Sequence, residues 1–309
     1  MNWLAVALVL VFLSCCKSSA GAGNWCYQSQ YSCNDTCYGP GKWSLVNSVC
    51  DGKKQSPVNI VTHKTVYNPG LKPFIFEGYD HTLDLLLQNT GYSVQINLPS
   101  TLKIKGSDFS ATYKAVQLHL HWGSEKESGS EHLLDGERYP MELHIVHMKE
   151  KYKSIDEAKN DSAGLAVLGF LYEESQIENA NYKDLVKALA IIQNYGQNTT
   201  VRNVQLSHLL LNSDEMLSYY RYSGSLTTPD CSEAVTWTVF TKPIGLSSTQ
   251  LTAFTGNLLS QSGKLMQGNF RPVQKLYGRT VHRSNSCTLF TDFTTLSVTV
   301  ALGFLTCPY

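Results

Sequence analysis

Short apolar or alternating segments, separated by turn residues, recur along most of this sequence. Segments of about four to eight residues with this pattern favour β-strands, because successive side chains of a strand point to opposite faces. Asn68-Pro69-Gly70 and Asp135-Gly136 are two of the turn signals between them. The strands that we expect are Leu83–Leu87, Tyr92–Leu98, Ala115–Trp122, Glu142–Met148, Leu165–Tyr172 and Val235–Phe240.

Helical patterns are few. Tyr182–Gln193 places apolar residues on one helical face, and Ser247–Leu259 opens with a serine suited to capping a helix. We find no internal repeat, low-complexity tract or charge block that would mark a linker. The sequence therefore predicts a mostly β protein with a few short helices, folded as one domain over residues 24–283.

Composition and charge exclude two classes of protein. The 309 residues include 25 Lys and Arg against 25 Asp and Glu, and 42% are hydrophobic. So much apolar content excludes a disordered chain. A formal net charge of zero argues against a nucleic acid as partner, because binding a polyanion requires a basic face.

An apolar run near the N-terminus indicates export. Trp3–Leu13 is too short to span a bilayer, which takes about 20 residues, and it suits the apolar part of a signal peptide. We expect residues 1–20 to form this leader, with cleavage between residues 20 and 23. An apolar first strand of the mature fold is the alternative.

The C-terminus carries a second apolar run, Phe293–Leu305, with small residues upstream. Small residues, a polar spacer and a terminal apolar tail are typical of a glycosylphosphatidylinositol (GPI) attachment signal, although this spacer is short. We expect residues 284–309 to be this signal, with attachment at Ser284 (or Asn285 or Ser286). An ordinary terminal strand remains the alternative.

The cysteines and the glycosylation sequons agree with export. Of nine cysteines, Cys15 and Cys16 would leave with the leader, and Cys287 and Cys307 with the tail. Five would remain, an odd number that implies a free thiol or an intermolecular bridge in a secreted protein. Asn-x-Ser/Thr sequons predict glycosylation at Asn34, Asn160 and Asn198.

A constellation of histidines indicates a metal site. His119 and His121 alternate on an expected strand, so their side chains share a face. Glu142 and His144 share a face of a later strand, which could bring His144 opposite the first pair. Three neutral imidazoles leave the fourth tetrahedral position open, as a catalytic zinc site requires, whereas histidines buried for structural reasons are the alternative.

Two further histidines lie near this constellation. By parity, His147 faces away from it, and His132 falls in a loop. We interpret both as structural or solvent-facing.

Several segments, in order along the chain, resemble those of the α-class carbonic anhydrases. The resemblance runs from about Trp25 to Val281 and implies a single domain around a large, mainly antiparallel twisted sheet. The matching segments are Gln55–Ile60, Gln117–Trp122, Gly129–His132, Glu142–His147, Gly224–Pro229, Val235–Trp237 and Asn269–Pro272.

The resemblance implies a role for each matching polar residue. His119, His121 and His144 would ligate Zn²⁺, and Gln117 and Glu142 would orient ligand imidazoles. The hydroxyl of Thr227 would accept a hydrogen bond from the zinc-bound hydroxide and pass its own proton toward Glu131. Thr228 would contact bicarbonate.

The resemblance also implies a substrate and a reaction. The enzyme would hydrate CO2 reversibly to bicarbonate and a proton, by attack of the zinc-bound hydroxide on CO2. For this uncharged linear substrate, the resemblance implies an apolar wall in the active site. Its expected residues are Val146, Val167, Leu226, Val235 and Trp237.

The sequence departs from the family at the proton shuttle. Fast members carry a histidine where this chain has Tyr92, after Asn89-Thr90-Gly91. A phenol with a pKa near 10 is a poor relay at neutral pH, whereas an imidazole is near its midpoint. We therefore expect slower, more buffer-dependent turnover. Tyr27, which matches a tyrosine that organises active-site waters, does not replace the relay.

Cysteine positions are similar to those of the family's extracellular, membrane-anchored branch, the carbonic anhydrase IV-like proteins. That resemblance implies the disulfides Cys26–Cys37 and Cys50–Cys231. Cys33 is unmatched: it could pair with Cys287, remain free or exchange with Cys37.

The same branch suggests where the protein acts and with what. It implies a lipid anchor at the extracellular face of the plasma membrane, inhibition by sulfonamides, and bicarbonate transporters as candidate partners. A freely secreted enzyme is the alternative. Some carbonic anhydrase-like domains have lost zinc ligands and act as binding modules, but this chain keeps His119, His121 and His144.

Overall fold

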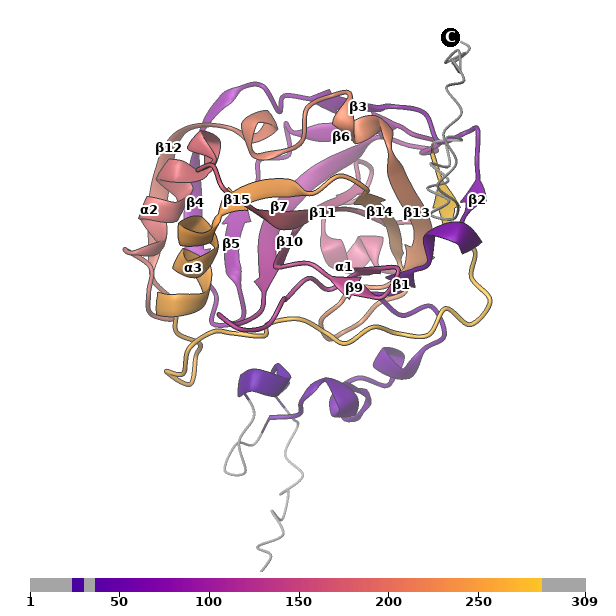
Figure 1. Cartoon of the computed structure of the whole chain (residues 1–309). Helices are drawn as coiled ribbons and strands as arrows, with labels where there is room; N and C mark the ends of the chain where they lie inside the picture. The colour runs from indigo at the N-terminus through magenta and orange to yellow at the C-terminus, as the bar shows by residue number, and fades with distance from the viewer. Residues whose placement is uncertain (1–23, 31–36, 285–309) are drawn as a thin grey trace, which may run out of the picture.

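The computed structural model describes residues 24–30 and 37–284. Within them, one large twisted sheet of thirteen strands forms the centre of the molecule (Figure 1). Its strands are β2 (Val66–Tyr67), β3 (Phe74–Glu77), β4 (Thr82–Asn89), β5 (Val94–Asn97), β6 (Lys103–Gly106), β7 (Tyr113–Trp122), β10 (Met141–Lys149), β11 (Leu165–Ser175), β12 (Asn198–Gln205), β13 (Tyr219–Gly224), β14 (Val235–Phe240), β15 (Ile244–Ser247) and β16 (His282–Arg283).

The strand order places β7 and β10 in the middle of this sheet. Ten strands lie side by side in the order β12, β4, β5, β7, β10, β11, β14, β13, β16, β2. Most neighbours run antiparallel, and the parallel pairs are β11 with β14, β11 with β15, and β16 with β2. The expected architecture, a mostly β protein around one large, mainly antiparallel sheet, is therefore confirmed.

A second, three-stranded sheet lies beside the first. Its strands are β1 (Asn59–Ile60), β8 (Leu133–Leu134) and β9 (Glu137–Arg138). The backbone N–H of Leu133 donates to the carbonyl of Val58, so the chain just after His132 is tied to the segment before β1. His132, which the sequence placed in a loop, is therefore held next to this small sheet.

Helices are short and few among the described residues. Ser247 caps α3 (Ser248–Asn257) in a capping box with Gln250, as the sequence predicted. None of the described helices has the length and apolar character needed to cross a membrane. The others are α1 (Ile155–Ala158), α2 (Lys183–Leu189) and the 3₁₀ turns η1 (Gln28–Gln30), η2 (Pro40–Leu45), η3 (Ser48–Asp51), η4 (Thr62–Lys64), η5 (Ala180–Tyr182), η6 (Leu206–Leu209) and η7 (Glu215–Leu217).

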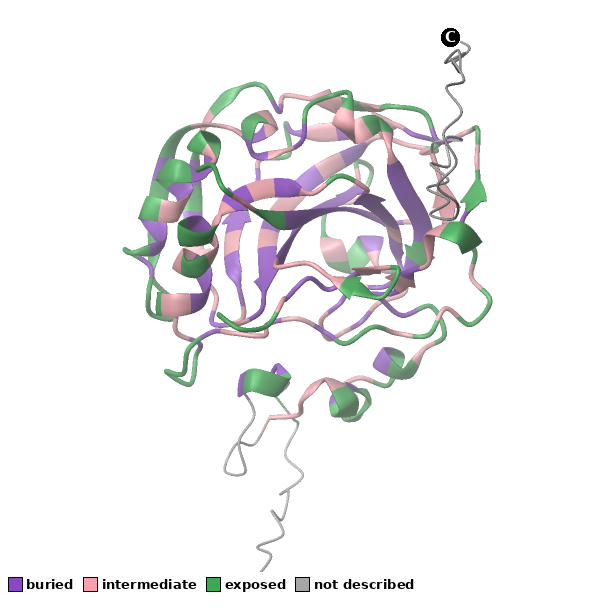
Figure 2. Cartoon of the chain, in the orientation of Figure 1, coloured by how far each residue is buried: buried purple, intermediate pink, exposed green. Residues whose placement is uncertain are grey.

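The sheet separates two apolar clusters, and its central strands are buried on both faces (Figure 2). Strand β10 shows the alternation: Leu143 and Ile145 join the larger cluster, which α2 and α3 cover, whereas Val146 joins the smaller one. The smaller cluster also contains Val167 and Trp237. The histidines expected to bind metal alternate with the larger cluster, so they lie on the same face as this smaller cluster.

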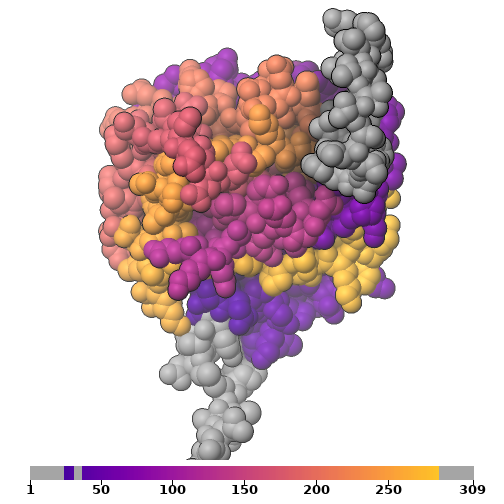
Figure 3. Space-filling view, in the orientation of Figure 1, coloured from indigo at the N-terminus to yellow at the C-terminus, as the bar shows by residue number. Residues whose placement is uncertain are grey.

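The N-terminal segment adds a third cluster, which is aromatic. The indole of Trp25 packs edge-on against the rings of Tyr27 and Trp43, with ring centroids 5.3 Å away in each case. Trp43 is fully buried and donates its indole N–H to the carbonyl of Cys26. Indigo atoms of this segment form the lower part of the molecule, next to yellow atoms from the C-terminal segment (Figure 3).

Candidate active site

The register between β7 and β10 gathers three histidines. His144 pairs directly with His119, and Glu142 pairs with His121. The three imidazole rings have centroids 4.6 to 5.2 Å apart, and one nitrogen of each lies within 4.8 Å of the others. The antiparallel neighbour that the sequence called for is therefore present.

Each imidazole is oriented by an oxygen that can only accept a hydrogen bond there. Nδ1 of His119 lies 2.8 Å from Oε1 of Gln117, and Nε2 of His144 lies 2.7 Å from Oε1 of Glu142. Nδ1 of His121 lies 2.7 Å from the backbone carbonyl of Asn269. Because these three nitrogens donate, the remaining nitrogen of each ring presents a lone pair to the other two rings.

Burial keeps two of these imidazoles neutral. It lowers the pKa of His119 well below the ordinary value, and the neighbouring His121 and His144 lower it further. Burial also lowers the pKa of His121, against the opposing charge of Glu131. Neutral imidazoles with lone pairs facing one point are the form in which histidine binds a metal.

Glu142 is the centre of a buried hydrogen-bond network. Its Oε2 accepts the backbone N–H groups of Glu131 and His132, at 2.8 and 2.7 Å. Its Oε1 lies 2.7 Å from Nδ1 of His132 as well as 2.7 Å from Nε2 of His144. Burial alone would raise the pKa of Glu142, but the two histidines hold it well below its usual range.

This network corrects one of the two readings of His132. The side chain is fully buried, not solvent-facing, and its Nε2 lies 2.6 Å from the hydroxyl of Tyr222. The structural reading therefore holds. His147 is also buried: it faces away from the three histidines and its Nε2 lies 2.6 Å from the hydroxyl of Tyr79.

Glu131 places an unpaired carboxylate oxygen beside the histidines. Its Oε1 accepts the backbone N–H of Arg271 at 2.7 Å. Its Oε2 is buried without a hydrogen-bond partner among the described residues and lies 3.6 Å from Nε2 of His121. The hydrogen bond from Thr227 that the resemblance implies is not formed in this structure, although Thr227 is close enough to line the same cavity as His144.

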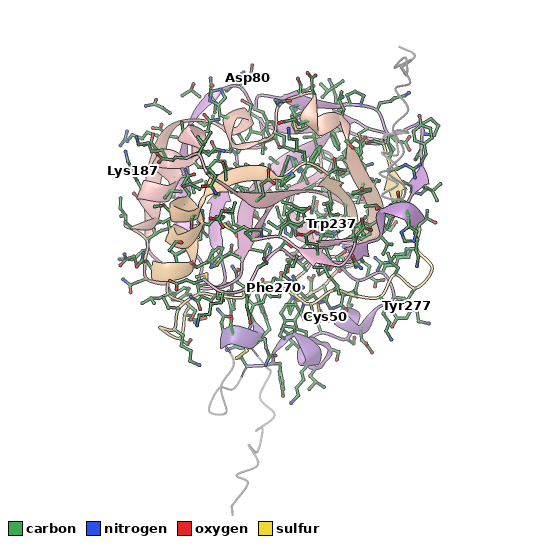
Figure 4. All side chains as sticks on the ribbon, viewed as in Figure 1. Cys50, Asp80, Lys187, Trp237, Phe270 and Tyr277 are labelled. Atoms are coloured by element: carbon green, nitrogen blue, oxygen red, sulfur yellow. A yellow bond between two sulfur atoms is a disulfide. The ribbon has the colours of Figure 1, made fainter. Side chains whose placement is uncertain are left out.

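A cavity of about 270 Å³ opens over these histidines. His119 and His144 line it, and Thr227 and Thr228 form part of one side. Its apolar wall consists of Val146, Val167, Leu226 and Trp237. Figure 4 shows Trp237 in the interior of the molecule.

Two expectations about this cavity need refinement. Val235 is fully buried in the cluster behind the apolar wall and does not line the cavity itself. Ile155 and Lys159, at α1, and Asp230 line it although the sequence reasoning did not single them out.

Asn269 is a further residue that the sequence reasoning did not assign. Besides its carbonyl on His121, its side chain accepts the backbone N–H of Trp122 at 2.7 Å. It also donates to the carbonyl of Tyr92 at 2.9 Å. The sequence signal that could have identified Asn269 was its position in the segment Asn269–Pro272, which resembles the carbonic anhydrases.

Comparison with known proteins decides the family. Residues 38–285 match the family described as eukaryotic-type carbonic anhydrase. The chain belongs to this family.

The chain is similar to carbonic anhydrases over most of their length. Carbonic anhydrase 4 of Oryctolagus cuniculus is 44% identical over 265 residues, which cover 85% of each chain. Carbonic anhydrase 4 of Rattus norvegicus is 38% identical over 286 residues, 92% of each chain. Carbonic anhydrase 15 of Mus musculus is 37% identical over 287 residues, which cover 89% of this chain and 87% of the relative.

In this carbonic anhydrase, Tyr92 is not among the residues that line the catalytic cavity. It precedes β5 and lines a separate cavity of about 200 Å³ with Trp25 and Gln30. Tyr27 is fully buried, and its pKa is raised by burial and by the negative charge of Glu131.

Both disulfides expected of this carbonic anhydrase are present. Cys26 bonds to Cys37, and Cys50 bonds to Cys231. The second bridge anchors the loop of Thr227 to the N-terminal segment, and the N–H of Cys231 donates to the carbonyl of Thr228 at 2.7 Å. Cys33 lies outside the described residues.

The positions expected to be modified fall partly within the described residues. Asn160 is exposed, and its side-chain amide donates to the carbonyl of Asp156 at 3.0 Å. Asn198 is exposed at the start of β12. The hydroxyl of Ser284 donates to the carbonyl of Leu217 at 2.8 Å. The leader, Asn34, Asn285 and Ser286 lie outside the described residues.

Proposed function

We propose that this carbonic anhydrase hydrates CO2 reversibly to bicarbonate and a proton, with Zn²⁺ held by His119, His121 and His144. One observation carries the proposal: three imidazole nitrogens face one point at the base of an apolar cavity. Each of them is unprotonated, because the other nitrogen of its ring donates to an oxygen. Nitrogen ligands in this number suit a catalytic zinc site with one open position.

The surroundings fit a divalent cation. The unpaired Oε2 of Glu131, buried 3.6 Å from Nε2 of His121, is a negative charge that a nearby cation would stabilise. A zinc ion bound there supplies Lewis acidity, which makes a water molecule acidic enough to act as a nucleophile near neutral pH. Gln117, Glu142 and the carbonyl of Asn269 fix the ring orientations that such an ion requires.

The chain's other residues orient the reactants. The hydroxyl of Thr227 can donate one hydrogen bond and accept another. If it donates to the unpartnered Oε2 of Glu131, its lone pair is left to accept a hydrogen bond from the reacting water, which orients that water toward CO2. The apolar wall of Val146, Val167 and Trp237 excludes other water and suits an uncharged substrate. Thr228, which lines the same cavity, would hydrogen-bond the anionic product.

Stopped-flow CO2 hydration tests this function. We expect the purified protein to contain about one zinc per chain, and a chelator or an aromatic sulfonamide to abolish hydration. A His119→Ala variant should lose zinc and activity together. Hydration that survives complete removal of zinc, or no hydration by zinc-loaded protein, would refute the proposal.

We also propose that the enzyme acts at the extracellular face of the plasma membrane, after removal of a leader between residues 20 and 23 and attachment of a lipid at Ser284 (or Asn285 or Ser286). Two disulfides among the described residues support an oxidising, extracytosolic compartment. Glycosylation at Asn34, Asn160 and Asn198 would follow from the same route.

Release by a GPI-specific phospholipase tests this location. We expect treatment of intact expressing cells to release the active enzyme into the medium. Activity already present in the medium of untreated cells would favour the freely secreted alternative. Activity that stays on the cells after complete treatment would contradict a GPI anchor.

A further inference from the structure

A second polar cavity, of about 510 Å³, shares no lining residue with the catalytic cavity. We call it the cationic cavity. Lys54, Arg221, Arg279 and His282 line it, and Asp108 is the one carboxylate among the described residues of its lining. The surface-exposed segment around Tyr277, which leads to Arg279, lies at the periphery of the molecule (Figure 4). This cavity has no part in the function proposed above.

Arg221 carries the strongest argument, because it is a buried cation that has no anionic partner among the residues that the structure describes. Its side chain is 8% exposed. Its guanidinium donates to the hydroxyl of Thr238 at 3.1 Å and to the carbonyl and hydroxyl of Ser107 at 3.0 and 2.8 Å. All of these acceptors are neutral. Burial lowers its pKa to about 10, so the group is still charged at neutral pH.

Buried charges are normally paired with an opposite charge. Asp108 lines the cavity but forms no ion pair with Arg221 among the described residues, and the ring of Phe109, 4.5 Å from the guanidinium carbon, offers only a partial substitute. These contacts use one of the two N–H groups on each terminal nitrogen of Arg221. The guanidinium therefore keeps unused hydrogen-bonding capacity beside a polar cavity.

The remaining lining residues add unused donors. The ammonium group of Lys54 and the hydroxyls of Ser223 and Thr236 have no hydrogen-bond or ion-pair partner among the described residues. Nδ1 of His282 is buried and also lacks a partner there. His282 lies directly opposite Arg221 in the pairing of β16 with β13, so the two side chains share a face of the sheet.

Arg279 adds a second fixed guanidinium. Its N–H groups donate to the backbone carbonyls of Ser223, Gln55 and Leu276, at 2.9, 2.7 and 3.0 Å, which hold it in one orientation. Three cationic side chains against one carboxylate give this cavity an excess of positive charge. Guanidinium, ammonium and hydroxyl groups together are the donors that proteins use to bind phosphate oxygens.

We propose that the cationic cavity binds a phosphate ester. Its volume lies within the range of small-molecule sites, about 300 to 1,000 Å³, so it has room for the organic group of an ester as well as for the phosphate. His282 precedes Ser284 by two residues. A lipid headgroup and a soluble phosphate ester share this chemistry, and the experiment separates the two sources.

The first arm measures binding of O-phosphoethanolamine to the full processed protein by calorimetry, with an aromatic sulfonamide present to fill the catalytic cavity. We expect saturable binding that Lys54→Glu weakens about tenfold or more, because a hydrogen bond to a charged group is lost and a like charge is introduced. Lys53→Glu is the matched control, since Lys53 is exposed and does not line the cavity; it should bind as the wild type does.

Histidine labelled with ¹⁵N gives a second readout that does not depend on a variant. Titration with O-phosphoethanolamine should shift the resonances of His282. Absence of saturable binding, equal affinities of Lys54→Glu and Lys53→Glu, or an unchanged His282 signal would overturn the proposal. CO2 hydration by both lysine variants should equal that of the wild type, so failure here is separate from failure of the proposed function.

The second arm identifies the source of the phosphate. Phospholipase-released protein is mixed with phosphatidylcholine vesicles, with and without phosphatidylserine, and sedimented. Co-sedimentation that Lys54→Glu abolishes and Lys53→Glu keeps would assign a lipid headgroup. Binding of O-phosphoethanolamine without co-sedimentation would assign a soluble ester.

Discussion

The phenol ring of Tyr92 stacks on the indole of Trp25, with ring centroids 4.2 Å apart and planes inclined by 21°. The Tyr92 hydroxyl lies 3.4 Å from the backbone carbonyl of Trp25. Burial and the nearby Tyr195 raise the pKa of Tyr92 above that of a free phenol. Among the described residues, the lining of the catalytic cavity contains no histidine besides His119 and His144. The described lining thus holds no further imidazole to exchange protons with the solvent near neutral pH.

We predict that Tyr92→His speeds CO2 hydration at low buffer concentration by about tenfold or more, because an imidazole near its midpoint can relay the proton. Stopped-flow assays in weak and strong imidazole-type buffer measure the effect, and strong buffer should remove most of it. Tyr92→Phe keeps the ring stack without the hydroxyl and should match the wild type. If Tyr92→His is no faster at low buffer, proton transfer does not limit this enzyme.

Glu142 should matter more for zinc affinity than Gln117, although each orients one ligand imidazole. Glu142 accepts four hydrogen bonds in the buried network, two of them from the backbone of Glu131 and His132. Among the described residues, the side chain of Gln117 forms a hydrogen bond only with His119. We predict that Glu142→Gln lowers zinc affinity about 10- to 100-fold and that Gln117→Ala lowers it less. Competition with a chelator measures both affinities. Equal losses would mean that the wider network does not support the site.

The sequence predicts the sheet best where side chains alternate over a long run. The expected strand Val235–Phe240 coincides with β14, and Ala115–Trp122 falls inside β7. Edge and short strands were missed because nothing local distinguishes them: β12 (Asn198–Gln205) is polar, and β16 has two residues. The expected strand Tyr92–Leu98 shortens to β5, since Tyr92 leaves the sheet to stack on Trp25.

The alternation of side chains along a strand also made part of the site predictable. Alternation placed His119 and His121 on one face, but only pairing between strands brings His144 opposite His119. Contacts made through the backbone have no side-chain signature, so the carbonyl of Asn269 on His121 could not be read from residue types. His132 was expected to be either structural or solvent-facing, and the sequence could not decide between the two because its partners, Glu142 and Tyr222, are distant along the chain.

We predict that the folded protein loses stability in acid because of His147. Burial lowers its pKa from 6.5 to about 4, so the folded protein resists protonation that the unfolded chain accepts. Its contribution to the free energy of unfolding is complete above pH 6.5 and is lost as the pH falls toward 4, by about 3 kcal/mol in all. Urea titrations of wild type and His147→Gln across this range should show a shallower pH dependence in the variant. Parallel curves would exclude this role.

An ion pair joins α1 to the loop that carries Thr227 and Thr228. Nζ of Lys159 lies 2.7 Å from Oδ2 of Asp230 and 3.0 Å from Oδ1 of Asp156. The hydroxyl of Ser232 donates to the other oxygen of Asp230 at 2.6 Å. Lys159 and Asp230 both line the catalytic cavity, so the ion pair forms part of its wall.

We predict that this pair positions the loop of Thr227. The Lys159 and Asp230 side chains are 22% and 31% exposed, so solvent weakens their attraction and we expect a coupling of only about 0.5 to 1 kcal/mol. Lys159→Met should therefore lower kcat/KM for CO2 about two- to fivefold through kcat, and Lys159→Arg should restore it. In a double-mutant cycle with Asp230→Asn, the second change should cost little once the first is made. Additive losses would show that the two residues act separately, and a change in thermal stability alone would assign the pair a purely structural role.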